Sequence, residues 1–150
     1  YYQQLQLGFN YRMTDIQAAL GLSQSNRLSE IIKKRQVLAA NYQQLLADLP
    51  LHTPATGPDN ISAYHLYIIR LADKQQRSKV FDSLRAAGIG VNVHYIPIHT
   101  QPYYQQLGFD WGDFPAAELF YESIISLPMF PELTEEQQQY LAGALRQALS

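Results

Sequence analysis

The sequence has no cysteine, which excludes a disulfide framework and a cysteine-ligated zinc site. It also has no apolar run close to the roughly 20 residues that a membrane-spanning helix needs. Lys and Arg number 11 against 13 Asp and Glu and form no basic cluster, which argues against a nucleic-acid binder held by phosphate contacts. The 150 residues are 47% hydrophobic and 16% charged, as in one ordinary domain with a buried core. We therefore expect a soluble, cytoplasmic, globular chain.

The chain starts Tyr-Tyr-Gln-Gln, without an initiator methionine, and its first polar and aromatic clusters already lie within residues 1–13. We expect a fragment of a longer protein, whose function belongs to the parent more than to these 150 residues alone.

Apolar residues recur at helical spacing from residue 14 to residue 49, which predicts one long helix. Thr14 and Gln17 have the spacing of a capping box at its start. Gly21 weakens the pattern, so we expect a kink or break near residues 21–26. Residues 1–13 show neither helical nor strand periodicity and are predicted to be a loop.

Helical and strand patterns alternate after Pro50, which predicts a small α/β domain over residues 50–150, of the α+β kind. We expect strands at 63–71, 89–95 and 124–127 and helices at 73–87, at 115–123 and from 134 to the C-terminus. An aromatic loop over residues 97–114 separates the second strand from the 115–123 helix. The prediction is one sheet of about three strands, with helices on one side. Its other face would meet the long first helix or a missing domain.

Two polar and aromatic clusters could carry chemistry, one at residues 8–12 and one at residues 94–99. The Asn10 amide and the Arg12 guanidinium suit recognition of phosphate or carboxylate, although both could instead shape the approach to the long helix. His94 and His99 are five residues apart with no carboxylate between them, so substrate binding, or a strand-end histidine bonded to backbone, is favoured over a metal. His65 lies in an apolar run and is expected to be structural.

The lysines decide against covalent catalysis by this chain. A lysine that forms a Schiff base needs desolvation or a nearby positive charge to disfavour its ammonium form. The chain has only four, two within the long predicted helix and two in the polar run DKQQRSKVFD, and we expect none of them to be catalytic. There is also no Gly-x-Ser-x-Gly elbow and no glycine-rich phosphate loop.

Five segments carry a resemblance to a known family: residues 7–19 (LGFNYRMTDIQAA), 62–67 (SAYHLY), 90–99 (GVNVHYIPIH), 101–104 (QPYY) and 126–131 (SLPMFP). In this order they resemble the C-terminal portion of the DegT/DnrJ/StrS-type sugar-nucleotide aminotransferases, which are pyridoxal-phosphate enzymes of fold type I. Within that family the sequence most resembles the enzymes of the pseudaminic-acid pathway that aminate C4 of a UDP-4-keto-6-deoxy amino sugar.

The resemblance implies a cofactor role for Asn10, because the matching asparagine in the family reaches across a homodimer interface to the pyridoxal-phosphate phosphate of the neighbouring subunit. Tyr11 and Arg12 match a segment near the substrate entrance. Residues 1–13 would then be an interface and active-site loop, residues 14–49 a linking helix, and residues 50–150 the small C-terminal domain.

The resemblance also implies that His94, Tyr95 and His99 border the sugar-nucleotide pocket. The aldimine lysine of the family, the ring that stacks on the cofactor and the aspartate at its ring nitrogen all lie upstream of this chain. We therefore expect a parent that moves an amino group from glutamate to a 4-keto-6-deoxy nucleotide sugar, and an inactive isolated fragment.

Two alternatives remain open at this stage. Some relatives of the family are sugar dehydratases, which differ at the upstream aldimine position. The chain could also be a non-catalytic dimerisation or interaction module that uses loop aromatics such as Tyr103, Tyr104, Phe109 and Trp111 as a contact surface, unless these rings cover a core.

Overall fold

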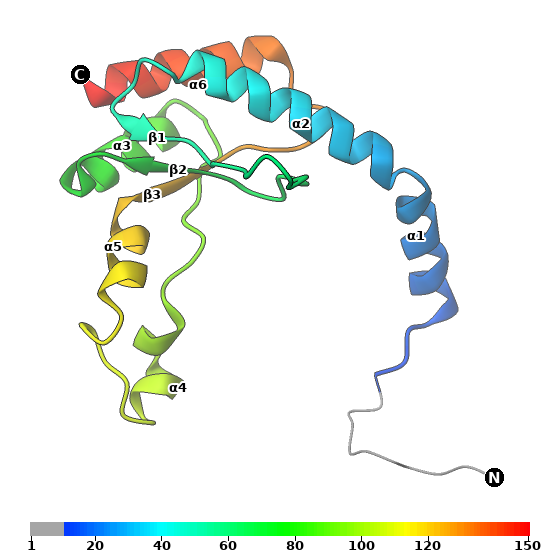
Figure 1. The fold of residues 1–150 in the computed structure, drawn as a ribbon, viewed down its shortest axis with the longest axis horizontal. Coiled ribbons are helices and arrows are strands. Elements are labelled where there is room, and N and C mark those ends of the chain that lie inside the picture. The colour runs from blue at the N-terminus through cyan, green and yellow to red at the C-terminus, as the bar shows by residue number, and fades with distance from the viewer. Residues whose placement is uncertain (1–10) are drawn as a thin grey trace.

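The computed structural model describes residues 11–150, in which helices surround one small three-stranded sheet (Figure 1). In chain order the elements are α1 (Asp15–Asn26), α2 (Leu28–Leu45), β1 (Leu51–His52), β2 (Tyr67–Leu71), η1 (Lys74–Gln76), α3 (Arg77–Ala86), η2 (Ile98–Thr100), α4 (Pro102–Gln105), α5 (Pro115–Ser123), β3 (Ile124–Leu127) and α6 (Glu135–Leu149).

Two helices, α1 and α2, stand where the sequence predicted one long helix. The capping box at the start is present: the Gln17 N–H donates to Thr14 Oγ1 at 3.3 Å, and the Thr14 N–H donates to Gln17 Oε1 at 3.0 Å. The break falls at Arg27, one residue beyond the range expected from Gly21. No residue of α1 is buried, and Figure 1 shows this helix leading away from the sheet.

The sheet has three antiparallel strands in the order β1-β2-β3, and three is the number predicted from the sequence. Its membership differs from the prediction, because residues 89–95 contribute only one bridge, Asn92 with Ser126. The Val91 N–H donates to the Ile89 carbonyl two residues back, at 2.9 Å, so the backbone turns there and cannot extend a ladder. The prediction of a strand over 89–95 was wrong, and β1 takes its place.

Strand β2 corresponds to the strand predicted over residues 63–71. It is shorter than predicted, because it begins at Tyr67. His65, which was expected inside an apolar strand, lies before β2 and is exposed. The expectation that His65 lies within an apolar strand was wrong. The chain bends at His65 and Leu66, just after Tyr64, whose φ is 43°.

One face of the sheet packs against α2, α3 and α6. In β2 the residues Tyr67, Ile69 and Leu71 are buried. Between them, Ile68 is half-buried and Arg70 is exposed. The alternation follows from the strand period of two, which sends successive side chains to opposite faces. The opposite face was expected to meet the long first helix or a missing domain. Since α2 lies on the same face as the other two helices, the first of these alternatives was wrong for α2.

A buried glutamine joins α6 to α2 inside this core. Gln138 is fully buried, its Nε2 donates to the Leu38 carbonyl at 2.9 Å, and Asn41 Nδ2 donates to its Oε1 at 3.4 Å. It lies three and seven residues before Leu141 and Leu145, so it shares their inward face. Tyr140, two residues after Gln138, points away from that face and is 60% exposed.

Replacing Gln138 by alanine is expected to lower the free energy of unfolding by about 2–4 kcal/mol, because it removes a buried hydrogen-bonding pair and leaves a cavity. The measurement is urea denaturation of both proteins. Gln139→Ala is the matched control, since the exposed Gln139 bonds only Glu135 of its own helix, and it should change stability by less than about 0.5 kcal/mol. Equal losses in the two variants would contradict this account of the core.

Candidate functional site

His94 lies beside β3, where a serine of the strand holds its ring. The Asn92–Ser126 bridge brings the segment against β3, and Nδ1 of the half-buried His94 lies 2.9 Å from Ser126 Oγ. The Tyr95 ring packs edge-on against the imidazole, with centroids 4.7 Å apart, and Tyr95 is 69% exposed. The structure therefore brings these two expected site residues together at the sheet and leaves one ring accessible.

His99 has different surroundings, although it is only five residues further along. It is 7% exposed, and its Nε2 lies 2.8 Å from Glu118 Oε1 on α5. The same carboxylate oxygen accepts the N–H of Gly112 at 2.8 Å and the N–H of Phe114 at 3.2 Å. An ionised carboxylate only accepts hydrogen bonds, so with Glu118 ionised Nε2 of His99 carries the hydrogen. His99 thus ties the beginning of the aromatic loop to α5.

The charge on Glu118 follows from this geometry. Burial alone would raise the pKa of Glu118, but the hydrogen bonds from His99 and from the two loop amides, together with the charge attraction of His99, hold it below its ordinary value. A carboxylate with a lowered folded-state pKa stabilises the fold above its unfolded pKa. That contribution is lost as the pH falls through the folded value.

We expect Glu118→Gln to be destabilising at neutral pH and to lose most of that effect in acid. The difference in unfolding free energy between wild type and variant should shrink as the pH falls from about 5 to about 3. Denaturation measured across this range checks the sign. Glu132→Gln, at an exposed carboxylate, is the control and should follow the wild-type pH profile. A constant difference between wild type and Glu118→Gln would show that the carboxylate charge does not hold the loop.

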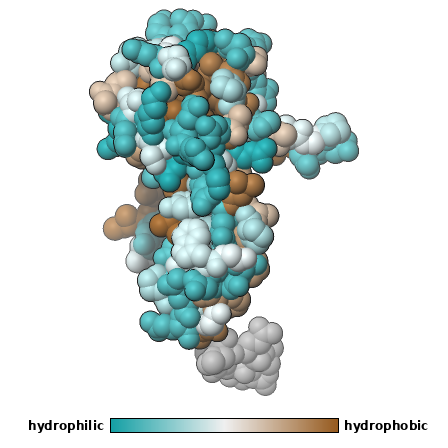
Figure 2. All heavy atoms as spheres, turned by 90° about the vertical axis from the view of Figure 1, so that its left-hand side faces the viewer, coloured by the Kyte–Doolittle hydropathy of each residue, from teal (hydrophilic) through white to brown (hydrophobic). Residues whose placement is uncertain are grey.

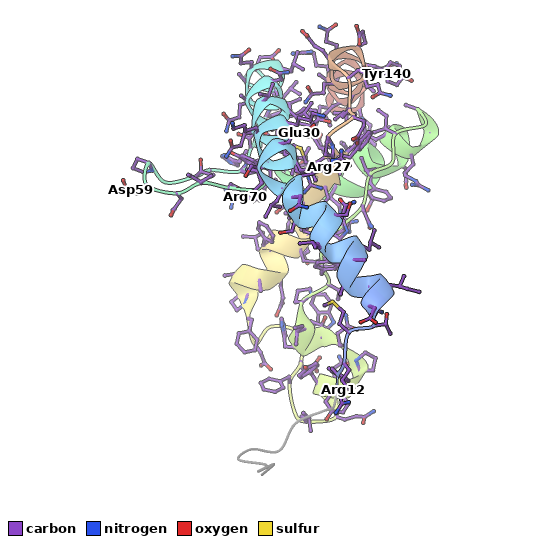
Figure 3. The ribbon with its side chains drawn as sticks, turned by 90° about the vertical axis from the view of Figure 1, so that its right-hand side faces the viewer. Arg12, Arg27, Glu30, Asp59, Arg70 and Tyr140 are labelled. Carbon is purple, nitrogen blue, oxygen red and sulfur yellow. The ribbon has the colours of Figure 1, made fainter. Side chains whose placement is uncertain are left out.

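The N-terminal group of expected site residues lies elsewhere in the chain. Tyr11 is 91% exposed, and Arg12 is exposed (Figure 3). Both lie just before α1, whose start is on the opposite side of the molecule from α4 and α5 (Figure 1). One chain therefore does not bring Tyr11 and Arg12 to the histidine segment. Asn10, the expected cofactor ligand, lies outside the described residues.

The aromatic loop and α5 form an arm that extends below the sheet (Figure 1). Several of its large apolar side chains are at least 40% exposed and do not cover the core: Tyr103, Leu107, Phe109, Trp111, Phe114, Leu119 and Phe120. Figure 2 shows apolar groups, in brown, where the upper body meets the lower part of the molecule. The aromatic residues expected at a contact surface are thus exposed in this chain, apart from the half-buried Tyr104.

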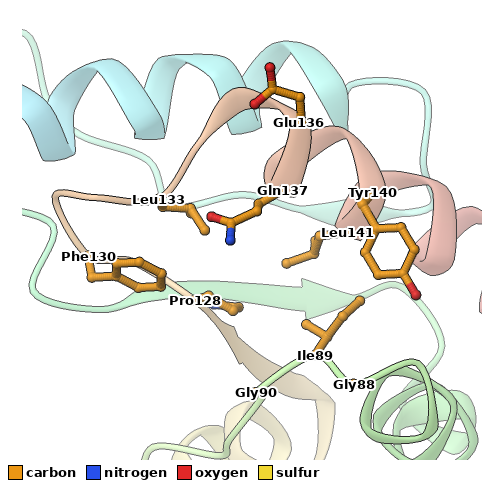
Figure 4. A pocket seen from close by; sticks show the side chains of 10 residues that line it. All are labelled: Gly88, Ile89, Gly90, Pro128, Phe130, Leu133, Glu136, Gln137, Tyr140 and Leu141. Atoms are coloured by element: carbon orange, nitrogen blue, oxygen red, sulfur yellow. The ribbon is translucent and has the colours of Figure 1, made fainter.

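A separate pocket of about 400 Å³ lies between the beginning of α6 and the turn at residues 88–90 (Figure 4). Phe130, Leu133 and Leu141 give it apolar walls, and the Tyr140 hydroxyl at its edge donates to the Ala87 carbonyl at 3.1 Å. None of the site residues expected from the sequence lines it. Within residues 11–150 no group of three or more His, Asp or Glu could hold a metal ion, and no helix is both long and apolar enough to cross a membrane.

Comparison with known proteins gives this geometry its context. The model of the DegT/DnrJ/EryC1/StrS aminotransferase family matches residues 1–146. The chain belongs to this family. It is 37% identical to the spore coat polysaccharide biosynthesis protein SpsC of Bacillus subtilis, over 97% of this chain and 39% of that protein.

Solved structures of aminotransferases have the same fold as this chain over the residues that match. The sugar aminotransferase Spr1654 of Streptococcus pneumoniae in its PMP form matches with a TM-score of 0.85 and 33% identity, over 91% of this chain and 35% of that one. Helicobacter pylori PseC, an aminotransferase of pseudaminic acid biosynthesis, matches with a TM-score of 0.86 and 33% identity, over 98% and 40%. The fold is therefore that of the matching portion of pyridoxal-phosphate aminotransferases, and the chain spans about two fifths of the length of these relatives.

The cofactor of the family is pyridoxal phosphate, carried by neighbours of this chain as PLP or PMP. The described residues do not form a complete site for it, because the lysines offer no suitable covalent attachment. Lys34 is ion-paired with Glu30 at 2.8 Å and Lys74 with Glu122 at 2.5 Å, each at the surface, and Lys33 and Lys79 are exposed. All four lysines of the chain therefore lie at the surface, and none is buried in a pocket.

Two residues of the site were missed from the sequence, Glu118 and Ser126. They lie 19 and 32 residues from the histidines that they contact, and both pairs form only when the chain folds. The quoted family segment 126–131 contains Ser126, but nothing in its local sequence pattern connects it with His94.

Proposed function

We propose that this chain is the C-terminal part of a pyridoxal-phosphate-dependent aminotransferase that moves an amino group from glutamate to a 4-keto-6-deoxy nucleotide sugar in the cytoplasm. The observation that carries the proposal is the family match over residues 1–146, together with similarity to solved sugar aminotransferases over 91% or more of the chain. A UDP-linked amino sugar is the proposed acceptor, supported by the similarity to PseC.

In this proposal residues 14–49 link a large N-terminal domain, outside this chain, to the small domain at residues 50–150. The parent is a homodimer, and Asn10 in the loop at residues 1–13 binds the cofactor phosphate of the neighbouring subunit. The separation of Tyr11 and Arg12 from the histidine segment within one chain supports a site assembled from two subunits.

The proposed substrate-binding residues are Tyr11 and Arg12 at the entrance and His94, Tyr95 and His99 in the pocket wall. An arginine offers five N–H donors for a phosphate or carboxylate, and the exposed Tyr95 ring can cover a sugar face. His99 keeps this wall in place through Glu118. Pyridoxal phosphate supplies the electron withdrawal that makes amine transfer possible.

The test uses the full-length protein with pyridoxal phosphate, glutamate and UDP-, dTDP- or GDP-linked 4-keto-6-deoxy sugars, with the products identified by mass spectrometry. We expect one sugar to gain an amine while an equal amount of 2-oxoglutarate forms. A sugar that loses a hydroxyl as water without consuming glutamate would identify a dehydratase instead. If neither reaction occurs with any sugar and none of the sugars binds, the better hypothesis is a non-catalytic interaction module.

A further inference from the structure

The two histidines of residues 94–99 differ in which ring nitrogen is engaged. His99 uses Nε2, which is bonded to a carboxylate, and the ring is buried. His94 uses Nδ1, which is bonded to a hydroxyl, and the ring is half-buried. Among the described residues Nε2 of His94 makes no hydrogen bond. Each ring thus has one bonded nitrogen, and of the two rings the half-buried His94 is the more accessible to a ligand.

The hydroxyl that holds His94 belongs to a rigid position. Ser126 is 4% exposed, its backbone pairs with Ile68 in β2, and it exchanges two backbone hydrogen bonds with Asn92 at 2.8 and 3.2 Å. Opposite residues of an antiparallel pair point to the same face, so Ser126 projects from the face that carries Ile68, away from α2, α3 and α6. His94 thus lies on the face of the sheet that these three helices leave uncovered.

We propose that Ser126 is a positioning residue that fixes His94 through Nδ1, so that Nε2 of His94 is the atom that meets an oxygen of the nucleotide sugar. The inference rests on the proposed function and adds one residue and one atom to it. When the Ser126 hydroxyl donates to Nδ1, neutral His94 carries its hydrogen on Nε2 and can donate it to a phosphate or sugar oxygen.

The choice of a hydroxyl has a chemical consequence. A carboxylate at Nδ1 would only accept a hydrogen bond, would place the hydrogen on Nδ1 and would leave Nε2 of the neutral ring as an acceptor. A serine hydroxyl both donates and accepts, so the neutral donor tautomer is available to His94. This fits recognition of an oxygen-rich, anionic ligand, which offers acceptors and few donors.

The test is Ser126→Ala in the full-length protein, with each half-reaction measured separately. We expect KM for the keto sugar to rise about tenfold, as for loss of one buried hydrogen bond, with kcat changed less. The half-reaction with glutamate should keep its rate, because the proposal assigns Nε2 of His94 to the nucleotide sugar and not to this donor. Ser123→Ala is the matched control: Ser123 is equally buried but bonds the Leu119 and Phe120 carbonyls within α5, and it should leave KM unchanged.

A double-mutant cycle with His94→Ala shows whether Ser126 acts through His94. In the His94→Ala background, Ser126→Ala should raise KM less than about twofold, because the ring that it positions is gone. Unchanged KM in the single variant, equal damage to both half-reactions, or a full tenfold effect without His94 would each overturn the inference. If the wild-type protein transfers no amine to any keto sugar, the proposed function fails instead.

Discussion

Reduction of the full-length protein with sodium borohydride in the presence of pyridoxal phosphate is expected to label one lysine per subunit, on a peptide outside residues 1–150. The label requires a lysine whose surroundings disfavour the ammonium form. The lysines of this chain are exposed, and Lys34 and Lys74 are paired with carboxylates at the surface. Peptide mapping by mass spectrometry locates the labelled residue.

The isolated chain provides the control for this labelling. Residues 1–150 treated in the same way should show only traces of label spread over their four lysines, because exposed lysines react with free aldehyde weakly and without selectivity. A stoichiometric label on Lys33, Lys34, Lys74 or Lys79, in either protein, would contradict the expectation that the lysine that binds the cofactor covalently lies outside residues 1–150.

Replacement of Asn10 by alanine in the full-length protein is expected to weaken pyridoxal-phosphate binding by roughly tenfold to a hundredfold. A hydrogen bond to a charged group contributes about 1.5–3 kcal/mol, which corresponds to that range of dissociation constants. Titration of the apoprotein followed by absorbance measures the change. Asn26→Ala, at the exposed end of α1, is the control and should leave the affinity as it is.

Mixed dimers show which subunit the Asn10 side chain serves. The Asn10→Ala protein is mixed and refolded with a variant that lacks the labelled lysine, and each variant alone is inactive or weak. If Asn10 binds the neighbour's cofactor, half of the dimers are mixed and one of their two sites is intact, so about a quarter of the wild-type activity returns. Activity no higher than the sum of the separate variants would place Asn10 in its own subunit's site.

Helix boundaries were the part of the fold that the sequence predicted best, because they depend on local chemistry. Thr14 forms the capping box that its spacing indicated, and Thr134 forms the same motif at the start of α6. The helix and strand expected at 115–123 and 124–127 have those bounds in the structure. Each of these features is decided by contacts within four residues or by a short, continuous apolar run.

The sheet was harder to predict, because strand pairing depends on distant partners. Residues 89–95 alternate as a strand does, yet only Asn92 pairs, since the turn at Val91 takes an amide out of the ladder. The two-residue β1 is too short to produce a pattern at all. The sequence patterns predicted the right number of strands, but one predicted strand, residues 89–95, is absent from the sheet and β1 is present instead.

Local sequence found the two residue clusters, the resemblance implied their roles, and the structure added Glu118 and Ser126. Local sequence pointed to His94 and His99 together but could not separate their roles. The roles differ because Glu118 meets one ring and Ser126 meets the other. Gln138 was missed for the same reason, since a glutamine in a polar helix gives no sign of a partner on α2, 100 residues earlier.

The most direct measurement of the central claim is the absorbance of pyridoxal phosphate bound to the full-length protein during stepwise addition of substrates. We expect glutamate alone to remove the absorbance of the aldehyde form, and a 4-keto-6-deoxy nucleotide sugar added afterwards to restore it with one equivalent of amino sugar formed. A bound cofactor that does not respond to glutamate, or that no keto sugar restores, would contradict the assignment of this chain to a sugar-nucleotide aminotransferase.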